Sequence, residues 1–148
     1  MPEGSRLIDT NVLVYAYDVS EKGKRQIARG LLGEIWDLGG GVVSLQNLSE
    51  FFVAVTEKVE RPISPVDAKT IVSDILHSAR WLVIDRQART VIAAMDLVDR
   101  TGAPYWDALI AACMVEHGVH IIVTENERDF NKIPGLTVIN PFRARSWR

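Results

Sequence analysis

Short apolar runs alternate with longer stretches of helical periodicity along this chain of 148 residues. The runs lie at residues 7–8, 42–43, 81–84, 120–123 and 136–139. Strands that are separated by helices form βαβ units, and the resulting sheet has helices on both faces. The alternation therefore predicts an α/β fold of three layers, α/β/α, with a central, mainly parallel sheet of four or five strands.

The helical stretches have recognisable boundaries. An amphipathic pattern covers Lys22–Leu38 and stops at three consecutive glycines, and a second pattern covers Leu45–Val59. Further helices are expected at Pro65–Ser78, Gln87–Arg100 and Tyr105–Glu116. Within the last of these, Ala108–Val115 is apolar without a break, which predicts a helix that is buried on all sides.

The composition indicates one globular domain over residues 1–148, since 47% of residues are hydrophobic and 24% are charged. We expect residues 1–5 to be flexible and residues 143–148 to form a basic C-terminal tail. No apolar run approaches the roughly 20 residues of a membrane span, and the polar start does not resemble a signal peptide. Because Cys113 is the only cysteine, a disulfide within the chain is excluded, and we expect a cytoplasmic protein without a membrane partner.

The net charge of −2 by itself disfavours a nucleic-acid-binding protein. The basic residues are nevertheless clustered. Residues 22–33 contain four basic residues and no acid, and residues 128–148 contain five basic residues and a single acid, Asp129. Taken alone, the two clusters are interpreted as solvated surfaces.

Acidic residues follow the ends of predicted strands or begin predicted helices. In a parallel sheet, ligands bind beyond the carboxyl ends of the strands. Asp9 follows the first strand directly, Asp107 lies in the first turn of the apolar helix, and Glu125 and Asp129 follow the fourth strand. Helix capping explains Asp9 and Asp107 as well as a functional site does, and a solvated loop would explain Glu125 and Asp129.

Glu50 has the weakest pattern of the acidic candidates. On a helical wheel it lies with Gln46, Ala54 and Glu57, away from the apolar stripe of its helix. Periodicity therefore predicts a solvated side chain, although the position could also line a cleft.

Carboxylates from four separate segments could converge at one edge of the sheet. Closely placed carboxylates repel one another unless one takes up a proton or a cation lies between them. Ligation by oxygen atoms alone favours Mg²⁺ or Mn²⁺. The chemistry typical of such a cluster is hydrolysis of a phosphodiester by water that the metal activates.

Five segments resemble the PIN-domain family, and specifically the VapC-type toxin ribonucleases of type II toxin–antitoxin systems. In chain order they are LIDTNVLVYAYD (7–18), SLQNLSEFF (44–52), YWDALIAA (105–112), VTENERDF (123–130) and VINPF (138–142). The resemblance covers most of the chain, although Lys58–Arg80 carries no family signal. It implies a PIN-like fold and a metal-dependent endoribonuclease, which would be a homodimer neutralised by a cognate antitoxin.

The resemblance also implies roles for individual residues. The catalytic acids would be Asp9, Glu50, Asp107 and Asp129. Three of them, Asp9, Asp107 and Asp129, would bind Mg²⁺ or Mn²⁺, and Glu50 would bind it directly or through water.

Supporting roles would belong to Thr124, Asn126 and Asn11. Because some relatives carry an aspartate in place of Asn126, the fourth acid could be Asp129 or Glu125. Basic side chains would contact the RNA backbone, and the candidates are Lys22, Arg25, Arg29, Arg128 and Lys132.

Two other functions compete with this one. A catalytically weak or inert PIN-like module that binds RNA or protein would also explain Asn126. A doubly wound phosphatase or receiver domain could use Asp9 as phospho-acceptor, and the phosphatase version is disfavoured because Asn11 stands where it needs a second aspartate. Trp106 could stack on a base, but packing is the preferred interpretation.

Overall fold

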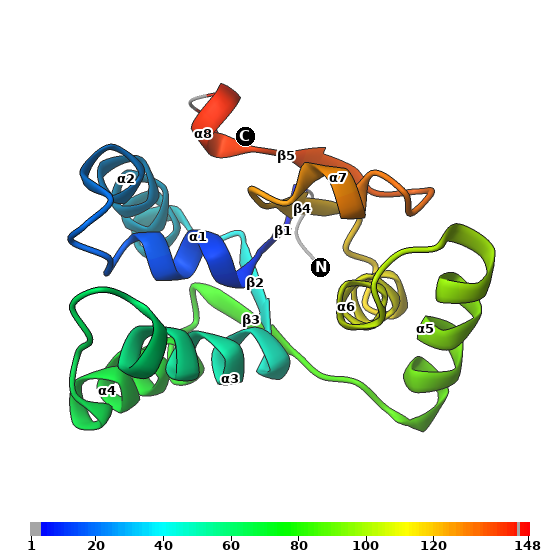
Figure 1. Ribbon diagram of the computed structural model, residues 1–148, viewed down its shortest axis with the longest axis horizontal. Helices are drawn as coiled ribbons and strands as arrows, with labels where there is room; N and C mark the ends of the chain where they lie inside the picture. The colour runs from blue at the N-terminus through cyan, green and yellow to red at the C-terminus, as the bar shows by residue number, and fades with distance from the viewer. Residues whose placement is uncertain (1–3, 145) are drawn as a thin grey trace.

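The computed structural model describes residues 4–144 and 146–148. Within this part of the chain, five strands form one sheet in the order β3-β2-β1-β4-β5 (Figure 1). Every pair of neighbouring strands is parallel, so the predicted α/β fold is confirmed with five strands. The strands are β1 (Arg6–Ile8), β2 (Gly41–Ser44), β3 (Trp81–Ile84), β4 (Ile121–Val123) and β5 (Thr137–Ile139).

The predicted helices are present, with ends within two residues of those expected. One difference is that the α-helix expected over Leu45–Val59 ends at Val53 and continues as a π-helical turn, η1 (Ala54–Lys58). The α-helices are α1 (Thr10–Tyr15), α2 (Lys22–Leu38), α3 (Leu45–Val53), α4 (Pro65–Leu76), α5 (Ala88–Thr101), α6 (Tyr105–Glu116), α7 (Glu127–Phe130) and α8 (Pro141–Ala144).

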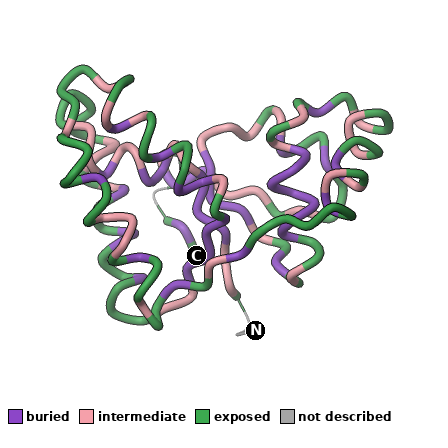
Figure 2. Tube along the Cα trace, turned by 90° about the horizontal axis from the view of Figure 1, so that it is seen from below, coloured by how far each residue is buried: buried purple, intermediate pink, exposed green. Residues whose placement is uncertain are grey.

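Successive strand residues face opposite layers of helices, as strand geometry requires. Ile8 and Val123 belong to the core beneath α1, α2, α3 and α4, whereas Leu7 and Ile122 belong to the core beneath α6. Figure 1 shows the first four helices on one side of the sheet and α5 and α6 on the other. Buried positions run along the sheet between these two groups of helices (Figure 2). The sheet is therefore the middle of three layers.

The apolar helix α6 is buried on nearly all sides. Residues Ala108–Met114 are inaccessible to solvent or nearly so, because α6 packs on the sheet and is covered by α5. The expectation is wrong for Val115, which is half exposed at the end of the helix. This packing holds the first turn of α6, with Asp107, at the border of the core.

The two chain ends are described only in part. Of the segment expected to be flexible, residues 1–3 lie outside the described residues, as does Arg145 in the basic tail. Trp147 is 6% exposed and donates a hydrogen bond from Nε1 to Glu34 of α2 at 2.6 Å, so the end of the tail packs against the domain. None of the helices in the described part of the chain has the length and apolar character of a membrane span.

Candidate metal and catalytic centre

Asp9 lies at the carboxyl end of β1, in the middle of the sheet. Its backbone N–H donates to the carbonyl of Val123 on β4 at 3.0 Å, and its side chain caps α1 by accepting from the N–H of Thr10 at 2.8 Å. The residue is 7% exposed. Asp9 is thus an N-cap, as one interpretation of the sequence had it, and it is also a buried carboxylate at the edge where parallel sheets bind ligands.

Three side chains from separate segments donate hydrogen bonds to the Asp9 carboxylate. Thr124 Oγ1, just beyond β4, donates at 2.7 Å, Asn47 Nδ2 of α3 at 3.3 Å, and Asn11 Nδ2 at 3.4 Å. The pKa of Asp9 is raised to about 6, and burial is the largest cause. Hydrogen bonds from Thr124 and Thr10 lower the pKa, and the nearby carboxylates of Asp107 and Glu50 contribute to the rise.

Asn47 is a site residue that the sequence analysis missed. It is fully buried, and its Nδ2 also donates to Thr10 Oγ1 at 3.1 Å. Its Oδ1 accepts from the backbone N–H of Ser44 while Ser44 Oγ accepts from the N–H of Asn47, both at 3.0 Å, which forms a capping box. A serine at the end of a strand, followed three residues later by asparagine, is the signal that could have identified it.

Glu50 lies at the rim of the same site. It is exposed, as periodicity predicted, yet its Oε2 accepts from Thr10 Oγ1 at 3.1 Å, next to Asp9. Its other oxygen accepts from Gln46 Nε2 at 2.7 Å. The helix position is therefore both solvated and directed at the site, since the exposed side of α3 faces the carboxyl edge of the sheet.

Asp107 and Asp129 form the opposite side of the site. Asp107 accepts from Asn126 Nδ2 at 3.2 Å, and burial, followed by the charge of Asp129, raises its pKa. Asp129, on α7, accepts from Lys132 Nζ at 3.3 Å. The charge of Lys132 lowers the pKa of Asp107, but less than the first two effects raise it.

Glu125 is held away from this group. Tyr15 donates a 2.7 Å hydrogen bond to one of its carboxylate oxygens, and Lys24 forms an ion pair with the other. Its backbone N–H donates to Asn11 Oδ1 at 3.2 Å. Of the two sequence alternatives for the fourth acid, the geometry favours Asp129, whose charge acts on Asp107.

The oxygen-rich donor set suits a hard divalent cation. Among residues 4–144 and 146–148, no three His, Cys, Asp or Glu side chains lie close enough together to enclose a metal ion as they stand. The charges of Asp107 and Glu50 nevertheless raise the pKa of Asp9, and the charges of Asp129 and Glu50 raise the pKa of Asp107. A cation among them would remove this repulsion, so the residues fit such an ion in chemistry, although their side chains do not surround one as they stand.

A profile of the PIN domain family matches residues 6–136. The chain belongs to the PIN domain family. The family expected from the five motifs is thereby confirmed, and no curated protein sequence matches the chain.

Solved structures with the same fold include proteins of toxin–antitoxin systems. A toxin–antitoxin complex from Klebsiella pneumoniae contains a chain with 23% identity and a TM-score of 0.67, over 93% of this PIN domain and 98% of that chain. VapC20 of Mycobacterium tuberculosis, a toxin that cleaves the sarcin–ricin loop, has 14% identity and a TM-score of 0.66, over 97% of each chain. VapBC2 of Rickettsia felis, bound to promoter DNA, has 21% identity and a TM-score of 0.63, over 91% and 97%. At these identities the similarity shows the fold.

The basic residues of this PIN domain are unevenly placed relative to the acidic centre. Lys132 lies beside Asp129, and Arg128 is exposed on α7. In the described part of the chain, Lys22, Arg25 and Arg29 of α2 form no hydrogen bond or ion pair with a candidate site residue. Their proposed contact with RNA therefore remains a prediction.

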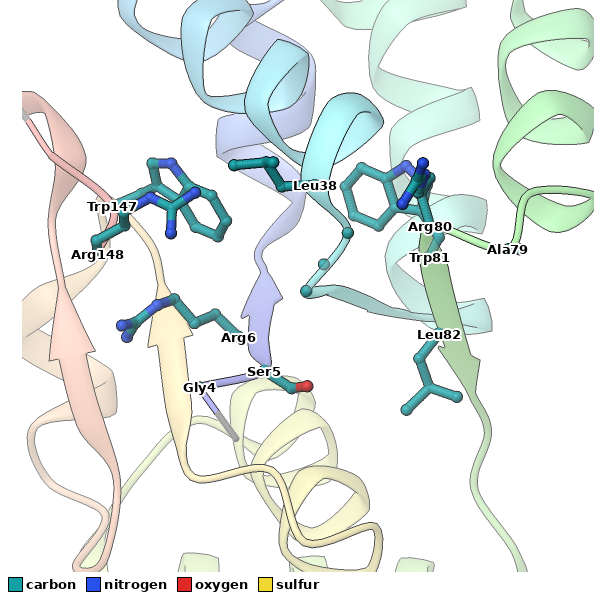
Figure 3. A pocket seen from close by; sticks show the side chains of 13 residues that line it. Gly4, Ser5, Arg6, Leu38, Ala79, Arg80, Trp81, Leu82, Trp147 and Arg148 are labelled. Carbon is teal, nitrogen blue, oxygen red and sulfur yellow. The ribbon is translucent and has the colours of Figure 1, made fainter. Parts of the chain in front are cut away.

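A separate pocket of about 730 Å³ lies at the opposite, amino-terminal edge of the sheet (Figure 3). Arg6, Arg80 and Arg148 line it together with Trp81 and Trp147, and none of its described lining residues is acidic. The cavity and the carboxylate centre are thus at opposite ends of the strands.

Proposed function

We propose that this PIN domain is a metal-dependent endoribonuclease, the toxin of a toxin–antitoxin pair, and that it hydrolyses RNA phosphodiester bonds in the cytoplasm. The observation that carries the proposal is the buried Asp9 carboxylate, held by Thr124 and Asn47 beside Asp107 and Glu50. A carboxylate that only caps a helix does not need side-chain donors from two other segments or further carboxylates beside it. Four acids at the carboxyl edge of a parallel sheet suit a site for a phosphate-bound cation.

Asp9, Asp107 and Asp129 would hold the cation, with Glu50 binding directly or through water. When bound, Mg²⁺ or Mn²⁺ lowers the pKa of water and offsets the negative charge of the attacked phosphate. Thr124 and Asn11 fix the orientation of Asp9, and Asn126 fixes that of Asp107. Glu50, at the solvent side, would alternatively orient the attacking water.

The partners of the structural relatives support the second half of the proposal. The Klebsiella pneumoniae and Rickettsia felis structures contain a toxin together with its antitoxin, and VapC20 cleaves an RNA loop. We infer a cognate antitoxin for this chain, an RNA substrate and a homodimeric assembly. The single thiol of Cys113, which is buried, suits the reducing cytoplasm.

Cleavage of a mixture of single-stranded and hairpin RNAs tests the enzymatic function. We expect cleavage by the wild-type protein with Mg²⁺ or Mn²⁺, none in EDTA, and a loss of at least about 100-fold in Asp9→Asn. Asp37→Asn is the matched control, since Asp37 is exposed near the end of α2. Cleavage that persists in EDTA or in Asp9→Asn would refute the assignment.

Calorimetric titration separates the enzyme from the inert module. An enzyme binds Mn²⁺ with an affinity that drops in Asp9→Asn and in Asp107→Asn, but not in Asp37→Asn. A protein that binds RNA or the product of a neighbouring reading frame, yet shows no heat with Mn²⁺, is the inert module instead.

A further inference from the structure

A groove of about 680 Å³ opens beside Glu50, on the side of the acidic centre that faces β3. It combines residues of α1, α3, η1, the loop after β3 and the first turn of α6. Two of the walls are α3 and the first turn of α6, and Figure 1 shows these two helices on opposite sides of the sheet. Its lining residues include Thr10, Gln46, Glu50, Lys58, Asp85, Arg86 and Trp106.

Trp106 is the aromatic wall of the groove. It is 61% exposed, so the expectation that it packs in the core is wrong. Its carbonyl oxygen accepts from Gln46 Nε2 at 3.3 Å, and its ring meets that of Tyr105 edge to face at 5.1 Å. Consecutive helix residues point in different directions, so the first turn of α6 directs Asp107 toward Asn126 while Trp106 lines the groove.

Two cations line the same groove without being neutralised. Lys58 and Arg86 are exposed, and within residues 4–144 and 146–148 neither of them forms an ion pair. The acid nearest to Arg86 in sequence is Asp85, whose Oδ1 accepts from the backbone N–H of Arg86 at 2.8 Å. Both guanidinium and ammonium groups therefore remain available for an anion.

We propose that this groove holds single-stranded RNA next to the acidic centre, with Trp106 stacked on a base and with Arg86 and Lys58 on backbone phosphates. The inference rests on the proposed function, since it takes Glu50 as the point where groove and centre meet. An exposed aromatic face beside free cations is the combination by which proteins bind single strands, and stacking of one base contributes roughly 1–3 kcal/mol. A duplex offers no unstacked base to Trp106.

Fluorescence anisotropy with a short, fluorescein-labelled single-stranded RNA tests the groove in EDTA, where no metal-dependent cleavage interferes. We expect Trp106→Ala to weaken binding by roughly 5-fold to 150-fold and Trp106→Phe to restore most of the affinity. Arg86→Ala should weaken binding and reduce the slope of log affinity against log salt by about 0.7. Arg100→Ala, an exposed cation of α5, is the control and should leave the affinity unchanged.

The outcomes separate this inference from the proposed function. If Trp106→Ala and Arg86→Ala both bind RNA as tightly as wild type, the proposal that the groove holds RNA is overturned. This includes the case in which the two variants lose antitoxin binding instead. A Mn²⁺ affinity that falls together with RNA affinity in Trp106→Ala also overturns it, because the residue then supports the centre. RNA binding that depends on Trp106, in a protein that neither binds Mn²⁺ nor cleaves, refutes the enzyme and leaves the groove in place.

Discussion

Thr124 and Asp9 are joined by a 2.7 Å hydrogen bond between the carboxyl ends of β4 and β1, although 115 residues separate them in sequence. Both residues are buried. Thr124 Oγ1 also accepts from the backbone N–H of Asn126 at 2.9 Å. Because the Asn126 side chain donates to Asp107, Thr124 links Asp9 to the loop that holds Asp107. The pair therefore connects the two halves of the acidic centre.

Thr124→Val should lower the free energy of unfolding by about 1–3 kcal/mol at pH 7, because a buried carboxylate loses a donor. It should also raise the pKa of Asp9 further. Urea denaturation measures the first effect. Thr70→Val, which removes an exposed hydroxyl of α4, is the control. Equal losses in the two variants would contradict this role for Thr124.

Asp9 should give stability a distinct dependence on pH. Its pKa rises from an ordinary 3.8 to about 6 on folding, so the folded state holds the proton more tightly between these values. The free energy of unfolding in EDTA should therefore fall as pH increases from about 4 to 6, by up to roughly 3 kcal/mol. Asp9→Asn has no carboxylate to ionise, so its free energy of unfolding should rise relative to that of wild type over the same pH interval. Parallel curves for the two proteins would show that Asp9 keeps its ordinary pKa.

Asn126→Asp should make the protein more dependent on a cation. The substitution replaces the donor to Asp107 with a fifth carboxylate at the centre, so repulsion should lower the thermal midpoint in EDTA. Mn²⁺ should bind more tightly and raise the midpoint more than in wild type, because only the folded state binds it. Asn131→Asp, at an exposed position at the other end of α7, should change neither quantity. An unchanged Mn²⁺ affinity would place Asn126 outside the metal site.

Asn47→Ala should cost about 1–3 kcal/mol of unfolding free energy, since it removes the α3 cap and a buried donor to Asp9. Gln26→Ala, at an exposed position of α2, should have little effect. Asn47→Asp keeps the acceptor for Ser44 but adds a charge beside Asp9. Its loss of stability should therefore grow above pH 6, and a pH-independent loss would argue against this contact.

Periodicity was sufficient for the sheet and for most helices, because each element has its own local pattern. Helix α6 is the clearest case, as its unbroken apolar run reflects burial between the sheet and α5. The end of α3 at Val53 was missed, since the continuation into η1 has the same apolar spacing.

The site was only partly predictable for a physical reason. Asp9 and Asp107 could be located because they follow or begin recognisable elements, but capping explained them equally well. Glu50 was selected by resemblance alone, since its periodicity signals exposure and carries no information about the neighbour it faces. The capping box marks Asn47 locally, but its contact with Thr10 joins distant segments, as does the contact of Trp106 with Gln46, and no local pattern reveals either contact.

The central position of β1 and β4 has a consequence for how the protein is made. β1 leaves the ribosome well before its neighbour β4, which spans Ile121–Val123. Until then Asp9 lacks Thr124 and the loop beyond it. A nascent or truncated chain that stops before β4 therefore has no assembled centre, and the proposed cleavage of RNA must await the synthesis of β4 and the loop that follows it.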